Sequence, residues 1–182
     1  CVGTASFAQP LSGCDVFVDT DGNRAPAGAA AEPMTRTGAD GSFAFPEYGE
    51  EGGGPEGPRV IMPHAGCIDA HTGLALPTSM EALGTVAHIS PLTTMQVNLL
   101  RAANGRRSRR LQTVAMRDVD AAARVRAALG LPSGWDLPYD AHTDVAAGIG
   151  GAAAVKAITQ MGTAARVSAL LAHLSAFGSG VL

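Results

Sequence analysis

The pattern of apolar and polar residues changes near residue 90. Before this point, short apolar runs are interrupted by Gly, Pro and Asp, which is typical of short strands joined by turns. After it, apolar residues recur at helical spacing within Ala-rich segments. The sequence therefore predicts an α+β protein, with a β-rich module over residues 1–89 and an Ala-rich helical cap over residues 90–182.

The first part predicts a series of short strands with turn residues between them, a pattern that favours an antiparallel β-sandwich or a barrel. Residues 37–41 read TGADG, and because Asp-Gly tolerates a positive φ, they predict a hairpin-like turn. Residues 47–58 read EYGEEGGGPEGP and predict a mobile loop. The expected strands cover residues 2–8, 14–18, 34–37, 42–45, 59–62, 74–76 and 85–89.

The second part predicts three to four helices. Ser90-Pro91 is a strong helix start, with serine as the N-cap and proline at the first helical position. Asn104-Gly105 supplies a stop for this first helix. Helices joined so closely are expected to form a small antiparallel bundle lying on the strands. The further helices are expected at about residues 115–129, 141–147 and 152–177.

Composition narrows the possible partners. Apolar residues make up 46% of the chain and aromatic residues only 4%, so we expect a core built from Ala, Val, Leu and Ile. A net charge of −3 provides no long-range field that would attract nucleic acid or anionic lipid. The basic run at residues 106–110 is interpreted as a solvated loop, with proteolytic processing or a polyanion contact as alternatives. No apolar stretch is long enough to predict membrane insertion.

Three cysteines, Cys1, Cys14 and Cys67, lack the spacing of a C-x-x-C pair or a zinc site, so a disulfide is favoured. A bond between Cys14 and Cys67 would close a loop of about 53 residues and contribute ~4 kcal/mol. A bond between Cys1 and Cys14 would contribute roughly 3 kcal/mol. The remaining thiol would pair with a segment outside the chain. Three buried free thiols in a cytosolic protein are the alternative, whereas a disulfide favours an extracellular location.

Residues 19–23 read DTDGN and carry the most informative pattern. Oxygen-bearing side chains at alternate positions match the first half of a calcium loop of the EF-hand type. The twelfth position of such a loop falls on Ala30, and Glu32 can replace it only in a longer loop. An Asx-rich turn that needs no ion is the alternative interpretation. The candidate calcium ligands are Asp19, Asp21, Asn23 and Glu32.

Catalytic patterns do not stand out in the sequence. His64 and His71 flank Cys67, but their spacing favours turn residues over zinc ligands. No serine has the G-x-S-x-G context of a hydrolase, and residues 148–151 lack the lysine of a phosphate-binding loop. The sequence therefore predicts a protein that is not an enzyme.

Three stretches form a series of short motifs: PLSGCDVFVDTDGN at 10–23, Glu32-Pro33 and TGADGSF at 37–43. Together they resemble a surface-adhesin B-type repeat, a transthyretin-like sandwich of seven strands that is also called carboxypeptidase-regulatory-like. Residues 67–74 (CIDAHTGL) and 89–94 (ISPLTT) are similar to a longer version of this module, in which a helical segment follows the strands. Such modules occur in large secreted surface proteins of bacteria and algae.

The resemblance implies secretion and a role in adhesion or in building extracellular fibres and walls. It also implies calcium at the acidic loop, although Arg24 stands where the family has Gly and Ala27 stands where it has Asp. The expected function is a non-catalytic structural or adhesive module of a larger surface protein, acting as a rigid spacer between neighbouring subunits or domains. The alternatives are a module that binds a glycan or protein through residues 20–33 and 47–58, and a fragment of a secreted hydrolase.

Overall fold

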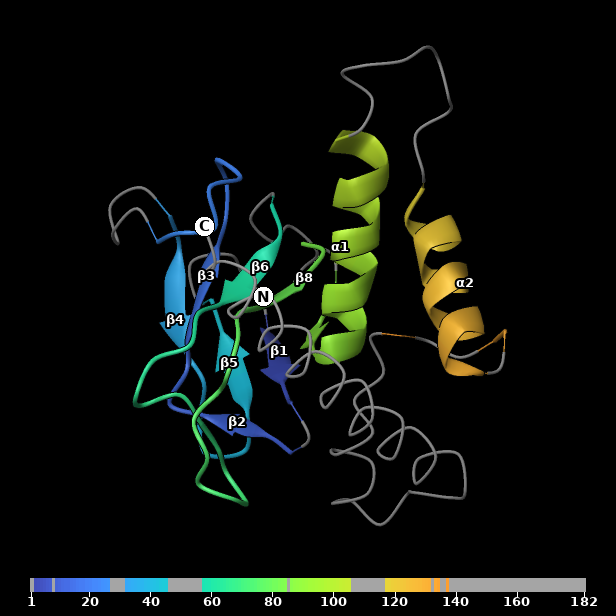
Figure 1. Ribbon diagram of the computed structural model, residues 1–182. Helices are drawn as coiled ribbons and strands as arrows, with labels where there is room; N and C mark the ends of the chain where they lie inside the picture. Colours follow the sequence, from blue (N-terminus) through green and yellow to red (C-terminus); the bar gives the residue numbers. More distant parts are fainter. Residues whose placement is uncertain are drawn as a thin grey trace, which may run out of the picture.

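The computed structural model describes residues 2–7, 9–26, 32–45, 57–84, 86–105, 117–131, 133–134 and 137. Within these residues, all strands precede Ser90 and both helices follow it (Figure 1). Most of the 47–58 loop, Cys1, the basic run and the helices expected beyond residue 140 lie outside the described residues. The strands are β1 (Val2–Ala5), β2 (Leu11–Ser12), β3 (Asp15–Val18), β4 (Met34–Arg36), β5 (Ser42–Ala44), β6 (Arg59–Ile61), β7 (Ile68–Asp69), β8 (Met80–Ala82) and β9 (His88–Ile89).

The described strands form three small sheets. The largest has the order β4-β3-β6-β8 and is antiparallel throughout. A second sheet has the order β5-β1-β9, in which β1 pairs parallel with β9. The third consists of β2 and β7. The parallel pair is possible because the chain between β1 and β9 includes all the other strands and thus provides a long crossover.

The expectation of an antiparallel sandwich followed by a bundle of three to four helices is wrong. The described residues form three separate sheets, one with a parallel pair, and two helices. Strands of two to four residues are too short to build two extended facing sheets. The first helix also packs on strand β8, while its apolar residues form a cluster of their own with the second helix.

The turn at residues 37–41 does not close a hairpin. Strands β4 and β5 on either side of it belong to different sheets, so the turn carries the chain from one sheet to the other. Gly41 has a φ of 78°, and a Cβ atom there would lie 2.5 Å from the Ala5 carbonyl oxygen. The Ser42 hydroxyl and backbone N–H donate to the Asp40 carboxylate and hold the pKa of Asp40 below its ordinary value.

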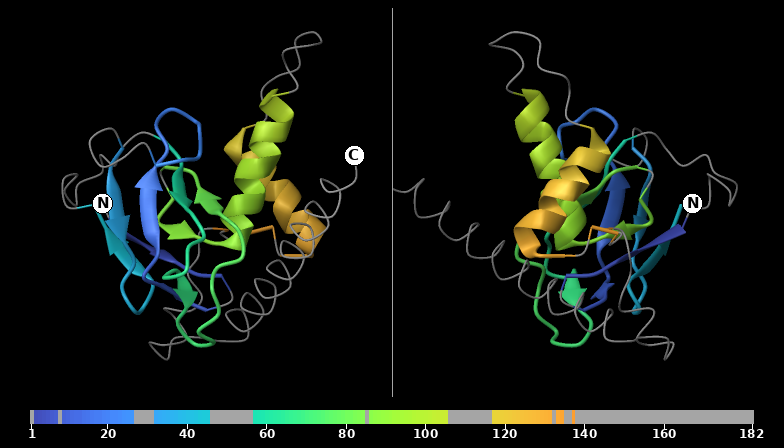
Figure 2. Two further views of the ribbon diagram at one scale, coloured as in Figure 1. Left: turned by 60° about the vertical axis from the view of Figure 1, so that its left-hand side comes forward. Right: turned by 90° about the vertical axis from the view of Figure 1, so that its right-hand side faces the viewer.

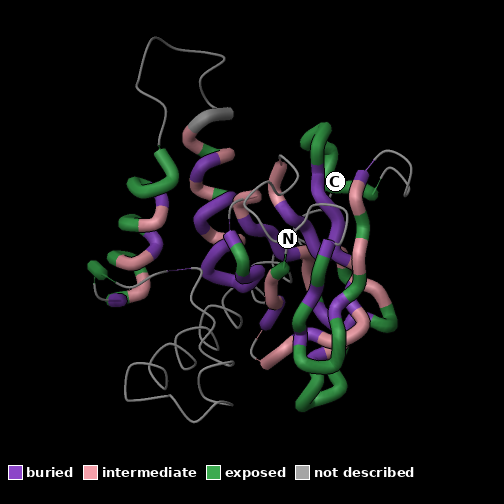
Figure 3. The backbone as a smooth tube through the Cα atoms, turned by 180° about the vertical axis from the view of Figure 1, so that it is seen from behind, coloured by how far each residue is buried: buried purple, intermediate pink, exposed green. Residues whose placement is uncertain are grey.

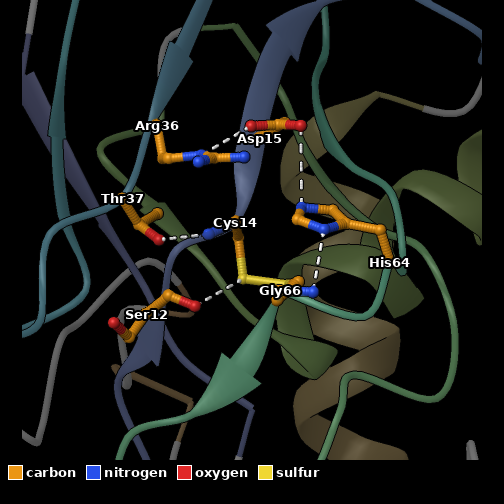
Figure 4. Close-up of a disulfide and its surroundings, with 8 residues drawn as sticks. Ser12, Cys14, Asp15, Arg36, Thr37, His64 and Gly66 are labelled. Carbon is orange, nitrogen blue, oxygen red and sulfur yellow. Dashed lines mark hydrogen bonds and ion pairs between the residues drawn. A yellow bond between two sulfur atoms is a disulfide. The ribbon is translucent and has the colours of Figure 1, made fainter.

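A disulfide joins Cys14 to Cys67, one of the two pairings considered from the sequence (Figure 4). Cys14 directly precedes β3 and Cys67 directly precedes β7, so the bond ties the largest sheet to the β2–β7 pair. Both residues are fully buried in the main core. Nearby, His64 accepts the Gly66 N–H through Nδ1 (3.1 Å), as expected of a turn residue. Figure 3 shows buried residues along the central strands and α1, and exposed residues in the turns and along α2.

Helix α1 (Pro91–Gly105) begins where the Ser90-Pro91 pattern predicts, so this prediction is confirmed. Helix α2 (Asp118–Leu129) ends at Gly130, whose φ of 64° gives the left-handed cap expected of glycine. Figures 1 and 2 show α1 lying between β8 and α2. A second apolar cluster holds the helices together through Leu92, Val125, Leu131 and Leu137. Neither described helix has the length and apolar character required to cross a membrane.

Candidate metal centre

Three carboxylates of the connection between β3 and β4 lie close together. Asp19, Asp21 and Glu32 each offer one oxygen, and these oxygens all lie within 4.8 Å of one another. Strand pairing produces this proximity, because Asp19 follows β3 and Glu32 precedes β4, and these strands are antiparallel neighbours. The Val18 N–H donates to the Pro33 carbonyl (3.0 Å) and extends the pairing towards the two acids.

Asp19 is the buried centre of this group, with a side chain that is 0% exposed. Its Oδ2 accepts the backbone N–H of Arg24 (3.3 Å) and lies 3.8 Å from Nη2 of Arg101. Its Oδ1 is buried and has no hydrogen-bond partner among the described residues. A buried carboxylate oxygen without a donor is costly, so a cation at this atom would remove a large desolvation penalty.

The other candidate ligands are held by hydrogen bonds to neighbouring residues of the same connection. Glu32 Oε1 accepts both the N–H (2.9 Å) and the hydroxyl (3.3 Å) of Thr20. Asp21 is exposed and accepts the N–H (2.9 Å) and the side-chain amide (2.6 Å) of Asn23. The side-chain Oδ1 of Asn23 accepts the Ala25 N–H (2.6 Å), so this side chain shapes the turn. Of the four ligands expected from the sequence, the structure groups Asp19, Asp21 and Glu32, while Asn23 donates hydrogen bonds to Asp21.

Two arginines link this group to another buried acid, Glu81 of β8, whose side chain is 1% exposed. Arg24 approaches one Glu81 oxygen through Nε (2.5 Å), and Arg101 of α1 pairs with the other oxygen. Arg24 also donates through Nη2 to Oδ1 of Asn98 on α1 (3.0 Å). The acidic loop, β8 and α1 are therefore joined by one continuous network of charged groups.

The charges of this network favour a divalent ion. The two guanidinium groups balance two of the four carboxylates, which leaves two negative charges. Three clustered carboxylate oxygens are the hard ligands that calcium prefers, and the group contains none of the sulfur or nitrogen ligands typical of zinc. The carboxylates are Asp19, Asp21, Glu32 and Glu81, and the guanidiniums are those of Arg24 and Arg101.

The S-P-L-T-T sequence at the start of α1 fixes the helix on β8. The Thr93 hydroxyl accepts the Ser90 N–H (2.9 Å) and lies 3.0 Å from the Glu81 carbonyl oxygen, to which it can donate. The Thr94 hydroxyl accepts the Glu81 N–H (2.9 Å). Since β8 is the last strand of its sheet, these threonines satisfy backbone groups that an edge strand would otherwise leave open.

We expect Thr93→Val to lower the free energy of unfolding by about 2 kcal/mol, because it removes the Thr93 half of the capping interaction with Ser90 and leaves the buried Ser90 N–H without an acceptor. Urea unfolding provides the measurement. Thr72→Val is the matched control, since the Thr72 hydroxyl serves only an exposed turn, and its effect should be about 0.5 kcal/mol or less. Equal effects of the two substitutions would contradict the role given to Thr93.

Sequence reasoning missed Glu81 and Arg101. Glu81 lies in a three-residue strand that the sequence did not predict, and its only signal was a charged residue among apolar neighbours. Arg101 lies on α1 with no neighbouring motif, and only the packing of the helix brings it to Asp19. Arg24 could have been singled out from the sequence, since it stands where the resemblance predicts a glycine.

One serine–histidine contact is present in the described part of the chain. Ser6 Oγ lies 3.1 Å from Nε2 of His88, and Thr4 Oγ1 lies 2.7 Å from Nδ1. Both Ser6 and His88 are buried, at 2% and 1% exposure. The contact joins the residue after β1 to β9, and neither side chain is accessible to a substrate.

No family model, curated protein or solved structure matches this chain. The resemblance to B-type repeats thus depends on the short motifs described above, and the geometry of the acidic loop has to be interpreted from its own residues.

Proposed function

We propose that this chain is a non-catalytic structural module of a larger extracellular protein, stabilised by a bound calcium ion and by the Cys14–Cys67 disulfide. The observation that carries the proposal is the buried Oδ1 of Asp19, which has no hydrogen-bond partner among the described residues. Asp19 itself belongs to the group formed with Asp21 and Glu32. Calcium would supply positive charge to these oxygens and would hold the β3–β4 connection in one conformation.

The disulfide supports the extracellular part of the proposal, since structural disulfides persist in oxidising compartments. The rigid-spacer role is supported by the way buried charges and the disulfide tie neighbouring elements together. Partners of such a module would be neighbouring subunits or domains of a surface assembly. The hydrolase alternative gains no support from Ser6 and His88, because both side chains are inaccessible to a substrate.

Calcium is expected to raise the melting temperature. At a free calcium concentration about a hundred times the dissociation constant, mass action contributes about 2.7 kcal/mol. For a chain of this size, that corresponds to a rise of about 5–10 °C. Differential scanning calorimetry after chelation and calcium titration measures this rise. The same titration with magnesium should give a smaller shift, because magnesium sheds its water shell reluctantly.

Two variants test whether the rise comes from this site. Asp19→Asn and Asp21→Asn each remove one negative charge from the group and should abolish most of the calcium-induced shift. Asp21 is exposed, so its replacement leaves the core unchanged. Asp40→Asn is the matched control, because Asp40 lies in another Asp-Gly turn outside the group and should retain the full shift. A melting temperature unaffected by calcium up to about 10 mM, beyond the range of extracellular modules, would contradict the proposal.

A further inference from the structure

We propose that calcium binding at Asp19, Asp21 and Glu32 acts as a clamp that holds helix α1 against strand β8. This inference depends on the calcium site proposed above and adds a conformational consequence of its occupation. The ion would fix the acidic loop, and the loop would then hold the helix through the side chain of Arg24.

Arg24 connects the two sites directly. Its backbone N–H donates to Oδ2 of Asp19, the residue whose other oxygen is buried without a hydrogen-bond partner among the described residues. Its side chain reaches Glu81 of β8 and Asn98 of α1. A change in the position of the loop backbone therefore moves the group that bridges the strand and the helix.

The backbone conformation of Arg24 makes its bridge between β8 and α1 depend on the conformation of the acidic loop. Its φ is 62°, and it is the only non-glycine residue with a positive φ among those described. This conformation costs about 1 kcal/mol or more for a residue with a Cβ atom, so it persists only where the surroundings enforce it. Without a cation, repulsion among the three carboxylates opposes the loop conformation that maintains it. With the cation, the loop is held and Arg24 remains in the bridging position.

Arg101 gives the coupling a second path. It lies on α1, pairs with Glu81 and comes within 3.8 Å of Asp19 Oδ2. An ion on Asp19 Oδ1 would hold this carboxylate in place as a partner for Arg101. Because coupling between two sites is reciprocal, docking of α1 should in turn favour calcium binding.

Hydrogen exchange of the whole chain, measured by mass spectrometry with saturating calcium and after chelation, tests the clamp. We expect calcium to slow exchange of the α1 amides by about tenfold, a typical strength for coupled sites. Strand β5 is the internal control, since it belongs to another sheet and should be slowed less. Equal slowing of α1 and β5 would indicate general stabilisation alone and would overturn the clamp.

Two variants isolate the bridge. Arg24→Gly retains the backbone N–H, favours the positive φ and removes the side chain, while Arg101 still pairs with Glu81. Asn98→Ala removes only the helix end of the bridge at an exposed position, and alanine does not weaken the helix. Both variants should still bind calcium in a calorimetric titration. In Arg24→Gly the slowing of α1 should fall below about twofold, and Asn98→Ala should give an intermediate value.

Arg36→Ala is the arginine control, because Arg36 pairs with Asp15 outside the network and its loss should leave the clamp intact. If the variants bind calcium and α1 is slowed as in the parent chain, the clamp is wrong while the calcium site stands. If the parent chain fails to bind calcium, both proposals are wrong. If Arg24→Gly does not fold, the result for Asn98→Ala decides between the first two outcomes.

Discussion

Replacing Cys14 and Cys67 together by alanine is expected to lower the free energy of unfolding by about 4 kcal/mol. The bond joins residues 53 positions apart and restricts the unfolded chain accordingly. The bond also links the sheet that carries the acidic loop to the β2–β7 pair, so its loss removes the covalent connection between these two sheets. Urea unfolding of parent and variant under oxidising conditions measures the difference.

Two controls accompany this substitution. Cys1→Ser leaves the Cys14–Cys67 bond in place and is expected to preserve its contribution. The parent chain treated with a strong reductant should approach the stability of the double variant. If the free energy of unfolding of the double variant lies within about 1 kcal/mol of the parent value, the disulfide contributes much less than expected from the length of the loop that it closes.

Replacing both Arg24 and Arg101 by methionine is expected to cost about 3–5 kcal/mol, because Glu81 would remain buried without a counter-charge. Its side chain is 1% exposed, and the two arginines are the described groups that pair with it. Methionine preserves much of the apolar stem of each arginine, so the loss should reflect charge more than packing. Equilibrium unfolding at neutral pH measures the effect.

A third substitution, added to the double variant, serves as the control for the unpaired charge. Glu81→Met removes the buried charge, and adding it to the double variant should restore most of the lost stability, since replacing a buried ion pair by apolar residues is often neutral. Each single arginine variant should cost less than half of the double variant, because the other arginine still pairs with Glu81. If Glu81→Met lowers the stability of the double variant further, the stability lost in the double variant does not come from an unpaired carboxylate.

Local signals in the sequence predicted local structure well. Ser90-Pro91 marked the start of α1, because a serine cap and an N-terminal proline act within a single turn. Gly130 marked the end of α2 for the same reason. The alternating oxygens of residues 19–23 indicated an acidic turn, and two of these residues, Asp19 and Asp21, lie beside Glu32 in the structure.

The arrangement of these elements could not be predicted in the same way. Strands β2 and β7 have two residues each, too few to show any periodicity, and their pairing depends on contacts far apart in the sequence. The Asp-Gly turn gave the same signal as a hairpin, although its strands pair with different neighbours. Glu81 was missed because its partners, Arg24 and Arg101, are 57 and 20 positions away in the chain. The resemblance to B-type repeats predicted a β-sandwich, but the described strands form three small sheets instead.

The most direct measurement is a crystal structure determined from crystals grown in calcium, with anomalous differences recorded at a long wavelength. We expect a peak between the carboxylates of Asp19, Asp21 and Glu32, at about 2.3–2.6 Å from their oxygens. The peak should contact Oδ1 of Asp19, and Arg24 should keep its positive φ. An ordered water in place of this peak at saturating calcium, or an Asp21 side chain turned away from the other two acids, would contradict the calcium site and the module built around it.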